Sequence, residues 1–159
     1  MGVYRAAEIC LNGHVTTSYA DVMPDLREKY CSICGEQTIT KCPHCDNPIR
    51  GSYYEPGFLG TSDYLKPNFC HNCGRPFPWT ERSLHAASEL MELSSILGDA
   101  ELIQFKTDLD SLIKDTPQTK VASFRVKVFL GKVSKEIASG VRDILVDIVS
   151  ETAKKAIWG

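Results

Sequence analysis

The chain has 159 residues, of which 43% are hydrophobic and 24% charged, and its formal net charge is −2. This length fits one ordinary domain or two small ones, and the balance of residue types is that of a soluble globular protein. The near-neutral charge excludes a strong overall attraction to nucleic acid or to an anionic membrane. No apolar run approaches the roughly 20 residues that span a bilayer, and neither a signal peptide nor a myristoylation pattern is present. We therefore expect a cytoplasmic protein with no membrane association.

Potential metal ligands are concentrated in the first half of the chain. Seven cysteines and one histidine form four short-spaced pairs, three of them Cys-x-x-Cys and the first Cys-x-x-x-His. In a reducing cytosol these pairs indicate metal binding rather than disulfides, and an odd number of cysteines cannot pair completely. Zn²⁺ takes four sulfur or nitrogen ligands in closed structural sites, so eight ligands predict two zinc ions per chain. The predicted ligands are Cys10, His14, Cys31, Cys34, Cys42, Cys45, Cys70 and Cys73.

The four pairs can share two metals in two ways. In the sequential grouping the first two pairs hold one metal and the last two hold the other, whereas a cross-braced grouping joins the first pair to the third and the second to the fourth. Gly35 and Gly74 each follow the second cysteine of a pair, where a zinc knuckle often needs a positive φ. This pattern favours the sequential grouping, and the cross-brace stays open. The alternative for His14 is a surface histidine, with the first site three-coordinate or completed by water.

Both predicted sites have the character of structural metal centres. A catalytic zinc keeps one coordination position open for water and has an acid or base beside it. The chain lacks the His-Glu-x-x-His motif and the zinc-deaminase signature, and the two sites use all eight ligands. We therefore expect no enzyme, no catalytic residue and no cofactor other than zinc. The metal supplies folding energy that a small, loop-rich segment cannot obtain from its own core.

Aromatic residues are frequent in segment 46–69, between the last two cysteine pairs. They could stack on nucleic-acid bases or hold a peptide. The favoured alternative is that they form the small core of the second zinc unit, because tiny zinc domains need every aromatic side chain that they have. The residues concerned are Tyr53, Tyr54, Phe58, Tyr64 and Phe69.

The composition changes after Trp79, where cysteines end and helical spacing begins. Thr80 is a good N-cap, and Trp79 before it can pack against Leu84 as a hydrophobic staple. The pattern therefore predicts a first helix over about residues 80–97, with Gly98 as its C-terminal stop.

Two further helical segments are predicted beyond that stop. Asp99 caps a helix over about residues 100–114. Pro117 then suits the first position of a long segment over about residues 118–157. Residues 124–130 alternate in polarity, so a strand is an alternative there, but the helical flanks favour a helix. An amphipathic stripe in the long segment could pack in a bundle or against its copy in a dimer; it consists of Val133, Ile137, Val141, Ile144 and Ile148.

Charge is distributed unevenly along the helical part of the chain. Residues 80–115 contain three Lys/Arg and eight Asp/Glu, whereas residues 116–159 contain eight and four. Between Lys120 and Lys135 there are five basic residues and no acidic one. This cluster could bind phosphate groups or a membrane surface. The favoured alternative is that it packs beside the acidic helices, because the opposite charges nearly cancel.

Three strings carry a family resemblance. They are Cys10-Leu-Asn-Gly-His14, Cys42-Pro-His-Cys45-Asp-Asn-Pro-Ile-Arg-Gly51 and Asn68-Phe-Cys70-His-Asn-Cys73-Gly-Arg-Pro-Phe-Pro-Trp79. Together they resemble a family of uncharacterised bacterial proteins that carry a domain of unknown function with an N-terminal double zinc ribbon. The resemblance covers about the first 82 residues and implies bacterial origin and two ribbons, but no established activity. The tail is loosely similar to helical segments of bacterial phage-defence proteins, an analogy of fold alone.

These features predict an α+β protein with zinc ribbons over residues 1–40 and 41–79 and a domain of about three helices over residues 80–159. The predicted role is a non-enzymatic adaptor or regulatory module that binds another protein in a bacterial cytosol. Nucleic-acid binding through the ribbon aromatics and the basic cluster is the first alternative. The second is a RING-like or other enzyme-associated module, with phage defence as one setting, and its RING-like form requires the cross-braced grouping. Self-association through the C-terminal helix is also compatible with the pattern.

Overall fold

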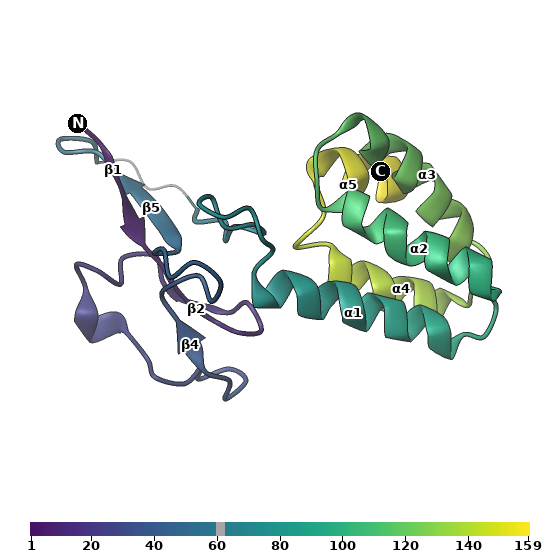
Figure 1. Ribbon diagram of the computed structural model, residues 1–159, viewed down its shortest axis with the longest axis horizontal. Coiled ribbons are helices and arrows are strands. Elements are labelled where there is room, and N and C mark those ends of the chain that lie inside the picture. Colours follow the sequence, from purple (N-terminus) through teal and green to yellow (C-terminus); the bar gives the residue numbers. More distant parts are fainter. Residues whose placement is uncertain (60–62) are drawn as a thin grey trace. The chain divides into compact units, whose positions relative to one another are not determined.

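The computed structural model describes residues 1–59 and 63–159, and the chain divides into two compact units (Figure 1). Residues 1–81 contain all the strands and knuckle loops among the described residues, and residues 82–159 contain almost only helices. The predicted α+β class is therefore confirmed. None of the helices in the described ranges combines the length and the apolar character that a membrane crossing requires.

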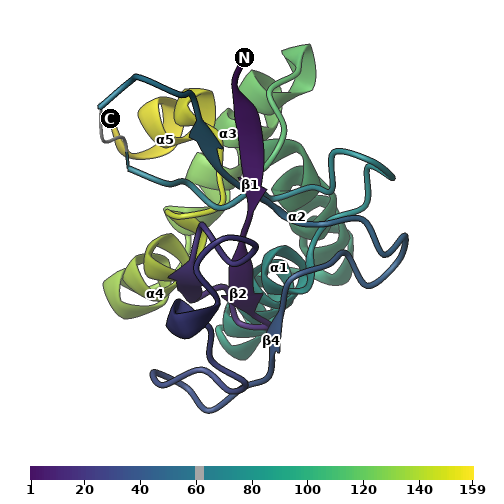
Figure 2. The same cartoon turned by 90° about the vertical axis from the view of Figure 1, so that its left-hand side faces the viewer.

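Two small antiparallel sheets organise the first unit. Strand β1 pairs with β5, and β2 lies between β3 and β4 (Figure 2). The strands are β1 Val3–Ala6, β2 Glu8–Cys10, β3 Val15–Thr17, β4 Thr38–Ile39 and β5 Arg50–Tyr54. A 3₁₀ turn, Pro24–Leu26, lies between β3 and β4 in the sequence. Because β1 and β5 come from different halves of the unit, backbone pairing joins the two regions that the sequence predicts to be separate ribbons.

A single hydrophobic core also joins them. Phe77 and Trp79 stack with ring centroids 4.6 Å apart, and the Trp79 indole N–H donates to the Pro67 carbonyl at 3.0 Å. Tyr64 packs against this core, whereas Tyr53, Tyr54 and Phe58 are exposed. The predicted core role of the aromatic segment is therefore only partly right. The buried members are Ala7, Ile9, Cys42, Ile49, Cys70, Phe77 and Trp79.

We expect Gly51→Ala to destabilise the first unit by about 1–3 kcal/mol, the usual cost of overpacking. A Cβ at Gly51 would lie 2.2 Å from the Ser18 carbonyl oxygen and 2.9 Å from the Ala6 carbonyl carbon, and backbone atoms cannot move aside cheaply. Gly140→Ala is the matched control, because its Cβ would meet the mobile end of the Leu90 side chain within a helix that favours alanine. Urea unfolding checks both variants, and equal effects would contradict this account.

The second unit is a bundle in which α2 packs on α3 and α3 packs on α5. The helices are α1 Pro78–Leu93, α2 Asp99–Leu112, α3 Pro117–Leu130, α4 Lys135–Leu145 and α5 Glu151–Trp158. The predicted number of about three is wrong, because the long segment after residue 117 contains three helices. Ser134 and Ser150 cap α4 and α5 by accepting the N–H groups of Ile137 and Ala153. Residues 124–130 lie in α3, so the helix that the flanking pattern favours there is confirmed over the alternative strand.

The predicted start and end of the first helix need correction. Helix α1 begins at Pro78, so Thr80 lies inside it and donates its hydroxyl to the Asn68 carbonyl at 3.1 Å instead of capping. The helix ends at Leu93, and Gly98 is the residue before α2 rather than the stop of α1. Proline at the first helical position explains the early start, because its φ suits a helix and it has no N–H to satisfy.

The side chains of the apolar stripe in the long segment are buried or half-buried within the bundle. Val141 and Ile148 are buried, and Val133, Ile137 and Ile144 are half-buried. A dimer contact through these side chains would therefore compete with the packing of the unit itself.

The basic cluster is neutralised in part by α2. The Arg125 guanidinium donates twice to the buried Asp108 carboxylate, each time at 2.8 Å, and this contact raises the pKa of Arg125. Lys132 donates to Glu101 at 2.6 Å and holds the pKa of that carboxyl below its usual range. Lys120 and Lys127 are exposed. The expected internal neutralisation thus accounts for some members of the cluster and leaves others on the surface.

Candidate metal centres

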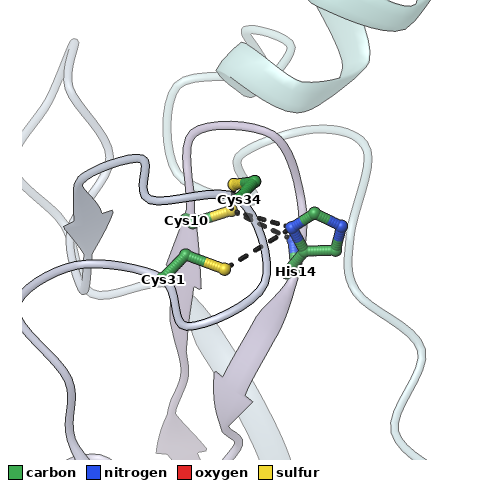
Figure 3. Close-up of side chains that lie close together, drawn as sticks. All are labelled: Cys10, His14, Cys31 and Cys34. Atoms are coloured by element: carbon green, nitrogen blue, oxygen red, sulfur yellow. Dashed lines mark hydrogen bonds between the residues drawn. The ribbon is translucent and has the colours of Figure 1, made fainter.

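The first cluster gathers three sulfur atoms around one imidazole nitrogen (Figure 3). Nδ1 of His14 lies 3.5 Å from the Sγ atoms of both Cys10 and Cys31, and the Sγ atoms of Cys10 and Cys34 are 3.8 Å apart. Cys10 lies at the end of β2, and His14 follows the turn that leads into β3. Cys31 and Cys34 come from one knuckle before β4. Four donor atoms therefore face one point from two separate stretches of chain.

The second cluster consists of four cysteines. The Sγ atoms of Cys42 and Cys73 are 3.8 Å apart, and those of Cys45 and Cys70 are 3.6 Å apart. Cys42 and Cys70 are buried in the core, whereas Cys73 is exposed. In each cluster all ligand atoms lie within 4.8 Å of one another, and each cluster could hold a metal ion.

The three Cys-x-x-Cys pairs adopt the same local fold. In each, the N–H of the residue after the second cysteine donates to the carbonyl of the first cysteine, at 2.8–2.9 Å. That residue has a positive φ every time: 74° at Gly35, 62° at Asp46 and 76° at Gly74. The positive φ expected at the two glycines is confirmed. The sequence pattern does not predict the positive φ of Asp46, because the expectation is based on glycine. Aspartate is nevertheless among the residues that tolerate the left-handed region.

Amide groups support the sulfur atoms. Backbone N–H groups of His14, Ile33 and Asn72 donate to the Sγ atoms of Cys10, Cys31 and Cys70 at 3.3–3.4 Å. The side-chain amide of Asn12 donates to Cys34, and this bond followed by a backbone N–H lowers the pKa of that thiol to about 6.

The same effect occurs in the second cluster. The side chain of Asn72, followed by the backbone N–H of Asn47, lowers the pKa of Cys45 to about 7. Burial, in contrast, raises the pKa of the Cys10 thiol in the first cluster. Amide donors favour the thiolate, which is the form that binds a metal. The sequence pattern does not predict the two supporting asparagines, whose only signal is that each lies between the two ligands of a pair.

The structure groups the eight predicted ligands in the sequential order. No cross-braced grouping occurs within residues 1–59 and 63–159. His14 lies among its three cysteines, whereas His44 and His71 are exposed and join neither cluster. His44 contacts the Arg75 guanidinium at 3.0 Å, and His71 contacts the Asn47 side chain at 3.2 Å. The sequential grouping removes the geometric basis for a RING-like module.

An aromatic and basic surface lies on β1 and β5 of the same unit. Arg50 stacks on the Tyr4 ring at 4.3 Å, and Arg5 stacks on the Tyr54 ring at 4.8 Å. Tyr4 and Tyr53 pack edge to face at 5.1 Å. An open hollow of about 460 Å³ next to these side chains is lined by Tyr4, Arg5, Asp21, Arg50 and His71, among others.

The first unit carries two four-donor clusters on short strands and knuckles, and a helical unit follows it. The protein is therefore of the class that has two ribbon-type candidate metal sites. The chain belongs to the family described as "Uncharacterized protein conserved in bacteria (DUF2321)", whose pattern matches residues 3–157. The match spans both units and confirms the resemblance to an uncharacterised bacterial family. No curated protein and no solved structure matches the chain.

Proposed function

We propose that the protein is a non-enzymatic zinc protein of the bacterial cytosol that acts as an adaptor or regulatory module by binding another protein. The observation that carries this proposal is that both clusters are complete. Each presents four donors, and no fifth His, Cys, Asp or Glu joins either of them in the described part of the chain. A metal with four protein ligands has no position left for a water or a substrate.

The donor separations support zinc as the metal. With Zn–S bonds of about 2.3 Å and Zn–N bonds of about 2.0–2.1 Å, a tetrahedral site separates two sulfur atoms by about 3.8 Å and a sulfur from a nitrogen by about 3.6 Å. The clusters show sulfur pairs at 3.6–3.8 Å and sulfur–nitrogen contacts at 3.5 Å. Three thiolates with one imidazole, and four thiolates, are both common ligand sets of structural zinc.

Complete metal sites leave the protein surface to carry the function. The exposed side chains include large apolar residues in both units, such as Ile33 in a knuckle, Phe58 after β5 and Phe124 on α3. Exposed aromatic and aliphatic side chains of this size are common in protein-binding surfaces. These surfaces support the adaptor role.

Nucleic-acid binding is the second candidate, favoured by the β1–β5 surface. Tyrosine rings next to guanidinium groups are the side chains that bind single strands by stacking and by contact with phosphates. The charge of the same unit argues against it, since residues 1–81 contain seven Lys/Arg and nine Asp/Glu. Thiolate-rich zinc sites add further negative charge, so protein binding remains the preferred function.

One experiment separates the two candidates. Tagged full-length protein is used to capture partners from a bacterial lysate, with and without nuclease, over a range of salt concentrations. We expect a protein partner to remain bound after nuclease treatment and in moderately high salt. Direct binding of a fluorescent oligothymidine is measured in parallel for Arg50→Glu and for the control Arg75→Glu, which lies outside the hollow. Steep salt dependence together with a loss specific to Arg50→Glu would favour nucleic acid instead.

A further inference from the structure

Helix α3 carries apolar side chains on two opposite faces. Its inner face is buried in the bundle through Ala122, Val126, Phe129 and Leu130. Its outer face exposes Val121, Phe124 and Val128, which have relative accessibilities of 47%, 55% and 59%. A helix that is apolar all round is normally covered all round. The outer face of α3 is apolar like a face that packs against another element, yet its three apolar side chains are exposed.

The three outer residues follow a coiled-coil spacing. From Val121 to Phe124 is three positions and from Phe124 to Val128 is four, which is the a, d, a spacing of a heptad repeat. Such a stripe packs against a second helix whose apolar residues recur at the same interval. The stripe is therefore suited to a helical partner rather than to an extended peptide.

The charges beside the stripe determine which helix fits. In this register Lys120 and Lys127 occupy g positions and Arg125 occupies the intervening e position. Helix α3 contains no acidic residue at all. In a parallel pair of two such helices, lysine at g would face arginine at e of the other copy. In an antiparallel pair lysine would face lysine and arginine would face arginine. Arg125 is already paired with Asp108, and α3 of a second copy has no acidic residue to face Lys120 or Lys127 in either orientation, so a second copy offers no charge complement.

We propose that the outer face of α3 is a docking site for an amphipathic helix of another protein, with acidic residues beside its apolar stripe. This inference rests on the proposed protein-binding function and specifies the chemistry of the partner. Acidic residues at the e and g positions of the partner would pair with Lys120 and Lys127, which lie on the solvent-exposed side of the bundle. Charge complementarity of this kind sets partner choice and association rate more than total affinity.

Two synthetic probes test the proposal on the full-length, zinc-loaded protein. Each is a helical peptide of about three heptads with leucine at a and d. One probe has glutamate at e and g, and the other has lysine there. Binding is measured by fluorescence anisotropy. We expect the glutamate probe to bind at least about tenfold more tightly than the lysine probe, a difference of the size expected for several interfacial charge pairs.

Substitutions then locate the binding surface. Phe124→Glu is expected to weaken the glutamate probe at least about tenfold, since it places a charge in the centre of an apolar contact. The double substitution Lys120→Glu with Lys127→Glu touches only exposed residues and is expected to reverse the preference in favour of the lysine probe. Leu93→Glu is the matched control: Leu93 is 75% exposed at the end of α1, away from the stripe, and binding should not change.

Several outcomes would overturn the docking site. Equal affinity for both probes, or binding that is insensitive to both Phe124→Glu and the double substitution, would exclude the assigned face. Sedimentation showing a dimer that Phe124→Glu dissociates would assign the face to a second copy. Phe124-dependent binding to vesicles of anionic phospholipid, with no binding to either probe, would assign it to a membrane surface. Capture of a protein partner that Phe124→Glu leaves intact would preserve the adaptor function and remove only the docking site.

Discussion

Removal of the two proposed zinc ions should unfold residues 1–81 while the helices of residues 82–159 stay formed. The first unit has a core of only a few side chains, and two of these are candidate metal ligands, Cys42 and Cys70. Without the metal, three thiol groups and an imidazole would crowd around the first centre, and four thiol groups would crowd around the second. Structural zinc contributes on the order of 10–16 kcal/mol to the folding of small zinc-binding peptides, more than a core of this size provides.

Metal analysis and circular dichroism check this expectation. The purified protein should contain two zinc ions per chain, and a strong chelator should remove both with little loss of helical signal. Cys42→Ser should lower the content to about one zinc ion per chain. The remaining ion should also be lost more readily, because the turn at Gly13 in the first site lies against Trp79 of the core that contains Cys42. His71→Ala is the matched control, since His71 lies within a Cys-x-x-Cys pair but is exposed and not part of either cluster.

A content of about one zinc ion per chain in the unaltered protein would contradict the two-site assignment. Loss of the entire helical signal on chelation would contradict the independence of the second unit. If the remaining zinc ion of Cys42→Ser is released to the chelator as slowly as in the unaltered protein, the two sites are not coupled.

Trp79→Ala should cost about 3–5 kcal/mol, the usual range for truncating a large buried aromatic side chain. Trp79 is 1% exposed, stacks on Phe77 and donates its indole N–H to the Pro67 carbonyl. Its ring also begins against the first knuckle, where a Cβ on Gly13 would lie 3.3 Å from the Trp79 Cγ, an atom that alanine lacks. Its loss therefore removes packing from the core and support from the turn between Cys10 and His14.

Urea unfolding of the zinc-loaded protein and the rate of zinc release to a chelator measure this effect. We expect a lower midpoint and faster release from the first site. Trp158→Ala is the control, because Trp158 is half-buried at the end of α5 and belongs to the helical unit. A similar loss of stability in the first unit for both variants, or unchanged zinc release from Trp79→Ala, would contradict the assigned role of Trp79.

The pattern of residue types was sufficient to locate the eight candidate ligands, because metal coordination requires particular donor atoms at short spacing. It also predicted the positive φ of Gly35 and Gly74, since the backbone of a knuckle demands it. The α+β class followed from the change of composition near Trp79. These are local properties, and a single stretch of chain is enough to specify each of them.

The boundaries of the helices were less predictable. Ser134 and Ser150 divide the long segment into separate helices, yet serine also occurs inside helices, and only the packing of the bundle turns these two into caps. Thr80 has the chemistry of an N-cap, but the proline two residues earlier starts the helix and leaves the Thr80 hydroxyl to bond Asn68.

The sequence by itself determined which residues are the candidate metal ligands, because cysteine and histidine at these spacings have few other uses. The tertiary structure decided which pairs face each other, that Cys42 and Cys70 of the second cluster belong to the core, and that the outer face of α3 is exposed. The physical reason is that these properties depend on residues far apart in the chain. Cys42 and Cys73 are 31 positions apart in the sequence, yet their Sγ atoms lie 3.8 Å apart in the fold. The side of α3 that is buried depends likewise on where α2 and α5 pack, which the periodicity of α3 alone cannot specify.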